Sequence, residues 1–181
     1  LVLMERAALA VTAELEKLPL YDDAVLVVCG TGNNGADGLA VARLLFLAGR
    51  NVEIVLVGNL DKMTPQCRKQ LEIVQAYGLS VSDHIKKTVS FSAVVDAVFG
   101  VGLSRMVEGC YAELLSEMNS LGGTKVAVDM PSGISSDTGA VLGTAFRADI
   151  TITFGFEKRG LHLWPGNTYS GRVVCASIGI T

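Results

Sequence analysis

Short apolar runs alternate with helix-forming segments along most of this chain. A short run that is apolar at every position is typical of a strand buried on both faces, as in a parallel sheet. The intervening segments repeat apolar residues at helical spacing, and one opens with Thr64 and Pro65, a favoured N-cap and first helical residue. This alternation predicts β-α-β crossovers and an α/β fold with a mostly parallel sheet. The predicted strands are 24–29, 52–57, 93–98, 125–128, 150–154 and 173–178, and the predicted helices are one from Leu1 to near Pro19 and others at 39–48, 64–77 and 111–121.

The composition limits the class of protein. The chain has 181 residues, 50% of them hydrophobic and 18% charged, which predicts one folded domain over residues 1–181. So few charges suggest helices on both faces of the sheet or an additional buried subunit interface. The formal net charge of −3 gives no electrostatic basis for binding nucleic acid. No apolar run is long enough to span a membrane, and the first ten residues lack a signal-peptide pattern.

The four cysteines are far apart in the sequence and are accompanied by only two histidines, so a zinc site is not expected. Cys29 and Cys175 lie in predicted strands and are expected to be buried, small hydrophobic residues. Scattered thiols suit a reducing compartment. We therefore expect a cytoplasmic protein, or a mitochondrial one if a leader has been removed.

A glycine-rich turn, residues 30–38, follows the first predicted strand and precedes a predicted helix. Gly30, Gly32 and Gly35 satisfy the G-x-G-x-x-G pattern in the position that a dinucleotide-binding fold requires. Glycines there let the backbone approach a pyrophosphate closely, and a helix N-terminus offers unpaired N–H groups and a positive partial charge. The turn is therefore predicted to bind a phosphate or nucleotide. The alternative is an ordinary tight connection between a strand and a helix.

The pattern differs from that of a standard dehydrogenase further along. An acid that binds ribose is expected about 20 residues after the glycines, but the second predicted strand runs into Gly58 and Asn59. The turn also carries Asn33, Asn34 and Asp37. Amide and carboxylate groups this close together suit hydrogen bonding to hydroxyls or binding of a cation.

Two further acids, Asp96 and Asp129, lie in or at the end of predicted strands. A carboxylate in a buried strand is costly unless it is paired or binds a ligand. In open α/β sheets the carboxyl ends of the strands line the ligand crevice. Asp96 and Asp129 are therefore expected to face the same crevice as Asp37. The alternative is that each of them caps a turn or a following helix.

Several motifs occur in a fixed order. They are Gly-x-Gly-Asn-Asn-Gly-x-Asp-Gly at 30–38, Val-Val-Asp-Ala-Val-Phe-Gly-Val-Gly-Leu at 94–103 and Val-Asp-Met-Pro-Ser-Gly-Ile at 128–134, with Leu-Met-Glu-Arg-Ala-Ala at 3–8, Lys-Arg-Gly-Leu at 158–161 and Pro-Gly at 165–166. On these motifs, in register over essentially the whole chain, the sequence resembles the YjeF N-terminal domain family. Members of that family are NAD(P)H-hydrate epimerases.

The resemblance implies a Rossmann-like three-layer α/β/α sandwich and a homodimer. It implies an isomerase in nicotinamide nucleotide repair, which converts the (R) form of hydrated NADH or NADPH, NAD(P)HX, to the (S) form that a partner NAD(P)H-hydrate dehydratase repairs. It also implies a bound potassium ion. Carried over residue by residue, it assigns the metal ligands Asn34, Asp96 and Ser132, and the substrate contacts Asn33, Asn34, Gly35, Ala36, Asp37, Gly100, Val101, Gly102, Leu103, Ser104, Arg105, Met106 and Asp129.

One residue departs from the family pattern, because Ala36 replaces the usual glycine. Its methyl group is harmless if Ala36 is helical, but it would crowd the phosphates if φ were positive.

Epimerisation requires the hydroxyl to leave the ring and to return on the other face. Asp129 is the candidate acid/base, because it ends a strand beside the predicted cation site. A dinucleotide-dependent oxidoreductase is an alternative that the missing ribose acid disfavours. A non-catalytic nucleotide- or protein-binding module is another, and the complete set of acids disfavours it.

Other polar and aromatic residues receive simpler interpretations. Lys158 and Arg159 are expected in a solvated loop, the alternative being contact with the extra phosphate of an NADPH-derived ligand. His84 and His162 are treated as structural, and Trp164 is expected to pack at a turn.

Overall fold

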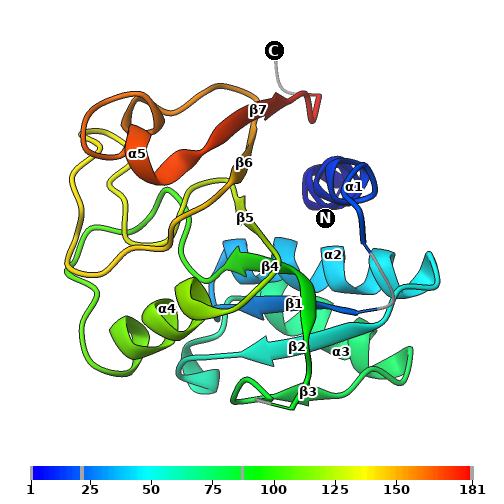
Figure 1. The fold of residues 1–181 in the computed structure, drawn as a ribbon. Helices are drawn as coiled ribbons and strands as arrows, with labels where there is room; N and C mark the ends of the chain where they lie inside the picture. Colours follow the sequence, from blue (N-terminus) through cyan, green and yellow to red (C-terminus); the bar gives the residue numbers. More distant parts are fainter. Residues whose placement is uncertain (1, 21–22, 87, 180–181) are drawn as a thin grey trace.

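Every apolar run predicted to be a strand is a strand of a single sheet. The computed structural model describes residues 2–20, 23–86 and 88–179, so Leu1 of the first predicted helix lies outside the described residues. The strands are β1 (Ala24–Cys29), β2 (Val52–Leu56), β3 (Val81–Ser82), β4 (Phe91–Ala97), β5 (Thr124–Val128), β6 (Ile150–Phe154) and β7 (Arg172–Ala176). They are all parallel and lie in the order β3-β2-β1-β4-β5-β6-β7 (Figure 1). The predicted parallel α/β sheet is therefore confirmed.

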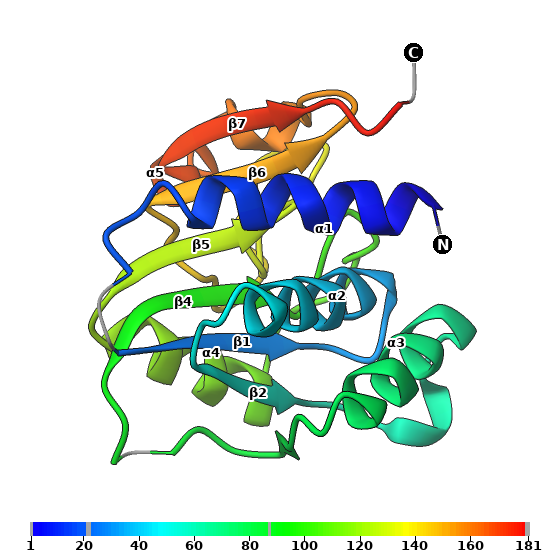
Figure 2. The same ribbon diagram turned by 90° about the vertical axis from the view of Figure 1, so that its right-hand side faces the viewer.

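Helices cover both faces of the sheet and make the fold three-layered. On one face α1 (Val2–Leu15), α2 (Asn33–Leu47) and α3 (Pro65–Ala76) pack in a row, while α4 (Cys110–Ser120) lies on the other face (Figure 2). Short helical segments occur at η1 (Leu60–Lys62), η2 (Arg159–Leu161) and α5 (Asn167–Ser170). None of the described helices is long and apolar enough to cross a membrane.

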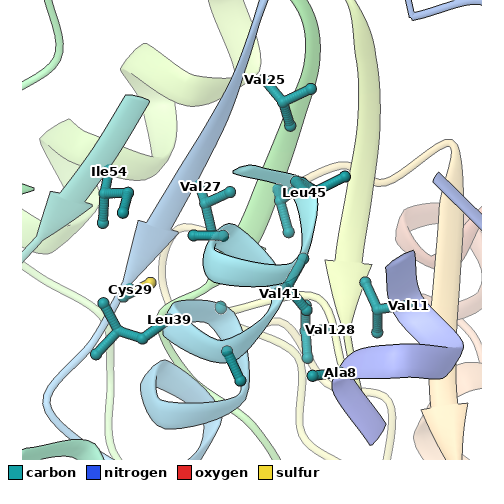
Figure 3. Close-up of a cluster of buried hydrophobic side chains, with 14 of the residues drawn as sticks. Ala8, Val11, Val25, Val27, Cys29, Leu39, Val41, Leu45, Ile54 and Val128 are labelled. Carbon is teal, nitrogen blue, oxygen red and sulfur yellow. The ribbon is translucent and has the colours of Figure 1, made fainter. Parts of the chain in front are cut away.

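Strand β1 shows why the predicted strands are apolar at every position. Val25, Val27 and Cys29 face the α1–α3 layer, where they meet Leu39, Val41 and Leu45 of α2 (Figure 3). The alternate residues Ala24, Leu26 and Val28 face α4 and pack in the cluster of its Leu115 and Met118. Both faces of the strand are buried, so both sets of residues must be apolar.

The start of α2 differs from the prediction. Residues 33–38 were expected in the glycine-rich turn, but the helix begins at Asn33. Gly35 and Gly38 lie inside α2, where neighbouring chain segments come too close to leave room for a side chain. A Cβ atom on Gly35 would lie 1.7 Å from the Gly30 carbonyl oxygen, and one on Gly38 would lie 2.5 Å from Ala97 Cβ.

The other elements show smaller differences. The two-residue strand β3 was not predicted, whereas the predicted loss of helices after Asp129 is confirmed for the connection between β5 and β6, residues 129–149. Cys29 is buried as expected, but Cys175 is exposed, because β7 is the edge strand of the sheet. Trp164 is 79% exposed, so its predicted packing at a turn is wrong.

Candidate active site

A cavity of about 560 Å³ opens at the carboxyl ends of β1, β4 and β5. The chain runs from β1 outward to β2 and β3, then returns to place β4 on the other side of β1. The cavity therefore lies at the point where the strand order reverses, which is where ligands bind in open α/β sheets. It is lined by residues 30–34, 37, 98–105, 111 and 129.

The N-terminus of α2 forms one wall of this cavity. Gly32 is the N-cap, and no side chain caps the helix there, which leaves N–H groups of the first turn available to a ligand. The turn lies tightly against the residue that follows β4, because a Cβ atom on Gly30 would lie 2.3 Å from the Val98 carbonyl oxygen. The dinucleotide pattern thus forms the strand–turn–helix structure that it was expected to form.

Asp129 follows β5 in an unusual backbone conformation. Its φ of 67° is the only positive value for a non-glycine residue among those that the structure describes, and this left-handed region costs energy for residues with a Cβ atom. The Asp129 N–H donates to the Ile152 carbonyl of β6 at 2.8 Å. The Asp129 side chain reaches the cavity wall, so the strained turn presents a carboxylate at the end of the sheet.

A lysine accompanies this carboxylate. Lys158 Nζ donates to Asp129 Oδ1 at 2.6 Å, and the two side chains are 21% and 13% exposed. Thr153 Oγ1 donates to the same oxygen at 3.2 Å. The prediction that Lys158 lies in a solvated loop is therefore wrong, because the loop after β6 folds back onto the end of β5. The neighbouring Arg159 is exposed as expected.

Asp37 shares the cavity with Asp129. The pKa of Asp37 is raised from 3.8 to about 7, mainly because the side chain is buried and secondarily because of the negative charge of Asp129. A carboxyl group with a pKa near neutrality is suited to giving or taking a proton. Asp37 and Asp129 thus come together as predicted.

Asp96 is fully buried and does not line the cavity, so the prediction that it faces the same crevice as Asp37 is wrong. The carboxylate is instead bound to the loop after β5. Its Oδ2 accepts from the Ser132 N–H at 2.7 Å, and its Oδ1 accepts from Ser132 Oγ at 2.6 Å and from the Val98 N–H at 3.1 Å. Burial raises the pKa of Asp96 to about 6, against the lowering effect of these hydrogen bonds. Asp96 and Ser132 therefore fasten the ends of β4 and β5 together, and the bond from Val98 is the turn-capping role considered as an alternative.

Asn34 approaches the same region from α2. A Cβ atom on Gly100 would lie 3.3 Å from Asn34 Cβ and Cγ. The amide nitrogen Nδ2 of Asn34 is buried, and no acceptor for it exists among the described residues. Because the O and N atoms of an amide can exchange places by a flip, this buried position also suits an oxygen ligand.

The remaining predicted contacts divide into two groups. Gly100–Arg105 line the cavity as expected, but Met106 does not and is 55% exposed. Gly35 and Ala36 are buried inside α2 rather than on the cavity wall. Ala36 is helical and has no positive φ, so its methyl group does not crowd the turn.

Sequence reasoning missed several residues of the site. Thr31, Phe99 and Tyr111 line the cavity, and Thr153 supports Asp129 from β6. Thr31 lies within the glycine motif, so it could have been predicted from its position. Thr153 is a single threonine in an apolar strand, and nothing in the sequence indicates its contact with Asp129.

A second cavity of about 1310 Å³ lies beside the first, between α4 and the end of β2. Thr31, Arg105 and Tyr111 line both cavities. Where β2 ends, Gly58 replaces the acid of a dehydrogenase, and the Asn59 side chain is occupied in accepting from the Asp61 N–H at 2.9 Å. His84 borders this cavity, is paired with Asp83 and is exposed.

Comparisons with known proteins identify the family. The family model described as YjeF-related protein N-terminus matches residues 1–160. A relative from Limosilactobacillus fermentum is 45% identical over 177 residues, covering 97% of this chain and 85% of the relative. One from Levilactobacillus brevis is 45% identical over 180 residues, covering 99% and 84%. Both relatives are named NAD(P)H-hydrate epimerase.

The fold has a counterpart among solved structures. The crystal structure of yeast ynu0, YNL200c, superposes with a TM-score of 0.79 at 22% identity, covering 97% of this chain and 77% of that one. The Rossmann-like three-layer architecture expected from the motifs is thereby confirmed. The matched family model and the two bacterial relatives together show that this chain belongs to the YjeF-related protein N-terminus family.

Proposed function

We propose that this chain is an isomerase that interconverts the (R) and (S) forms of NAD(P)HX in nicotinamide nucleotide repair. Relatives that are 45% identical over nearly the whole chain bear the name NAD(P)H-hydrate epimerase. The observation that carries the proposal is the pair of carboxyl groups, Asp37 and Asp129, in one cavity at the N-terminus of α2. The reaction requires a dinucleotide-binding site and a pair of acid and base groups, and this cavity offers both.

The proposed substrate seat follows the cavity walls. The pyrophosphate lies at the N-terminus of α2, where N–H groups and the helix dipole favour an anion. Asn33, Asn34 and Asp37 contact the substrate from α2, while the loop 100–105 and Asp129 contact it from the strand ends. Gly35 lets the Gly30 carbonyl approach α2 closely, and Ala36 is buried inside the helix, so neither is placed against the substrate.

The chemistry divides between the two acids. Protonation of the departing hydroxyl releases water, and the ring nitrogen stabilises the cation that remains. Water then adds to the other face and gives up a proton. Asp37 is suited to donate the first proton, since its raised pKa keeps it protonated up to about pH 7. Asp129 is the catalytic group that accepts the second, since it borders the cavity and is held in place by the Lys158 ammonium.

The oxygen donors of three residues support the proposal of a bound potassium ion. A carboxylate has about four acceptor positions, and Asp96 uses three of them for Ser132 and Val98. Asn34 Nδ2 is buried without a partner among the described residues, in a position that an amide flip would give to the oxygen, and Ser132 Oγ adds a third oxygen. Asn34, Asp96 and Ser132 would therefore hold the ion, which would supply positive charge close to the acids of the site.

A homodimer is part of the proposal. Val2, Leu3 and Leu9 of α1 have exposed side chains, at 74%, 47% and 51%. One edge of β7 pairs with no strand of the described part of the chain. Such surfaces support contact with a second copy. We also propose a cytoplasmic enzyme whose (S) product is consumed by an NAD(P)H-hydrate dehydratase.

The proposed function has a direct test. Purified (R)-NADHX or (R)-NADPHX incubated with the protein is expected to become a mixture with the (S) form faster than the uncatalysed interconversion. Chromatographic separation of the epimers over time measures this, with heat-denatured protein as the control. An unchanged epimer ratio with retained NADP⁺ binding would indicate a binding module, and oxidation of the nicotinamide would indicate an oxidoreductase.

The rate is expected to fall as pH rises through about 7. Asp37 is protonated below its pKa of about 7 and ionised above it, so the proposed acid disappears on the alkaline side. Above that value kcat/KM is expected to fall about tenfold per pH unit. Initial rates from about pH 6 to about pH 9, corrected for the uncatalysed reaction, measure this. An Asp37→Asn variant with the wild-type rate and profile would show that Asp37 is not the acid.

A further inference from the structure

Lys158 uses every proton of its ammonium group inside the protein. An ammonium carries three donors, and Nζ donates to Asp129 Oδ1 at 2.6 Å, to Thr153 Oγ1 at 2.9 Å and to the Phe154 carbonyl at 3.0 Å. Lys158 is also absent from the wall of the 560 Å³ cavity. Lys158 therefore has no donor left for a substrate phosphate, and we look for its role in the contact with Asp129.

Thr153 completes a closed triangle with these two side chains. It is fully buried in β6, and its Oγ1 accepts from Lys158 and donates to Asp129 Oδ1 at 3.2 Å. Both hydrogen bonds to the carboxylate thus end on the same oxygen. Among the described residues none donates to Oδ2, although the Asp129 side chain borders the cavity.

The backbone of Asp129 makes such an anchor necessary. A non-glycine residue persists at a positive φ only when its surroundings hold it there, and Asp129 has a φ of 67°. Its N–H is bound to Ile152 of β6 at 2.8 Å. The side-chain anchor comes from the same strand and from the loop after it, so β6 and that loop determine where the carboxylate that follows β5 lies.

We propose that Lys158 is a positioning residue for the reaction. It anchors Oδ1 of Asp129 and leaves Oδ2 to take the proton from the incoming water, while Thr153 fixes the ammonium in place. The inference rests on the proposed epimerase function and deepens it, because it gives a role to a residue that touches the acid–base group rather than the substrate.

Lys158→Met tests the proposal, because it removes the charge but keeps most of the length of the side chain. We expect kcat to fall about tenfold to 10²-fold, the usual consequence of a misplaced catalytic group, and KM to change little. Lys158→Arg is expected to recover part of the lost rate, because it restores a donor and a charge. Thr153→Val is expected to lower kcat by a smaller factor.

A double-mutant cycle separates positioning from general destabilisation. If Lys158 acts only through Asp129, adding Lys158→Met to an Asp129→Asn variant is expected to change the residual rate by less than about twofold. A matched control is Lys125→Met. Lys125 is also a mostly buried lysine that donates to backbone carbonyls, those of Leu121 and Gly123, but it lies in β5 at the end remote from the cavity. It is expected to affect thermal stability but not kcat.

The outcomes distinguish this inference from the proposed function. A wild-type protein without epimerase activity would overturn the function itself. An active wild type with an equally active Lys158→Met variant would overturn the role of Lys158 alone. Equal effects of Lys158→Met in the presence and absence of the Asp129 carboxylate would also overturn it, since Lys158 would then act independently of Asp129.

Discussion

Replacing Asp129 by asparagine is expected to lower the rate of epimerisation by about 10²–10⁴-fold, the usual cost of losing a general acid or base. The amide nearly matches the carboxylate in shape, so the strained turn at the end of β5 is expected to persist. It cannot take a proton, and its pairing with Lys158 loses the charge on one side. NADP⁺ binding is expected to be nearly unchanged, because the N-terminus of α2 is untouched.

The measurement compares epimerisation above the uncatalysed background with NADP⁺ affinity for the same protein samples. Asp137→Asn is a matched control, since Asp137 is exposed in the loop that follows Asp129 and is not part of the cavity wall. It is expected to keep the wild-type rate. An Asp129→Asn variant that also kept the wild-type rate would make Asp129 a binding residue and move the chemistry to Asp37 or a bound water.

The sheet was predictable because its strands are buried on both faces. Val25 and Leu26 of β1 face opposite helical layers, and both layers demand apolar residues. Strand β3 could not be predicted in this way, since Val81 and Ser82 form two residues at the edge and are partly exposed. The prediction that Cys175 is buried was wrong for the same reason, because β7 is an edge strand and is partly exposed to solvent.

The acids of the site were predictable because a carboxylate is conspicuous in an apolar strand. Asp96 and Asp129 stood out for that reason, and parallel strands bring their carboxyl ends to one edge. The partner of Asp129 was not predictable, since Lys158 lies 29 residues away on an irregular loop. Neither hydrophobic periodicity nor the spacing of a motif indicates such a contact in the sequence. A basic residue in a loop is also most often solvated.

The beginning of α2 was misjudged because glycine has two uses. The sequence pattern treats glycine as a residue for turns, where it permits a positive φ. At Gly35 the reason is instead the absence of a side chain, because the Gly30 carbonyl occupies the space of a Cβ atom. Close packing between a helix and the turn before it carries the same sequence signature as a longer turn, and only the packing tells them apart.

Gly35→Ala is accordingly expected to destabilise the fold, although alanine is the better helix former. The gain in helix propensity is about 1 kcal/mol. The added Cβ atom would lie 1.7 Å from the Gly30 carbonyl oxygen and 2.6 Å from its carbon. Both are backbone atoms, so no change of rotamer relieves the overlap, and the turn itself must move. Overpacking costs about 1–3 kcal/mol even where side chains can adjust, so the clash outweighs the gain.

Thermal unfolding of Gly35→Ala and Gly32→Ala measures this difference within one turn. Gly32 has a φ of −88° and no atom within 4 Å of an added Cβ, so its substitution is expected to leave the midpoint nearly unchanged or slightly raised. For Gly35→Ala we expect a net loss of about 2 kcal/mol, or a midpoint about 4–8 °C lower for a domain of this size. Equal midpoints for the two variants would mean that the turn moves away from Gly35 at little cost, and the narrow approach of Gly30 to α2 would then not be what requires a glycine at this position.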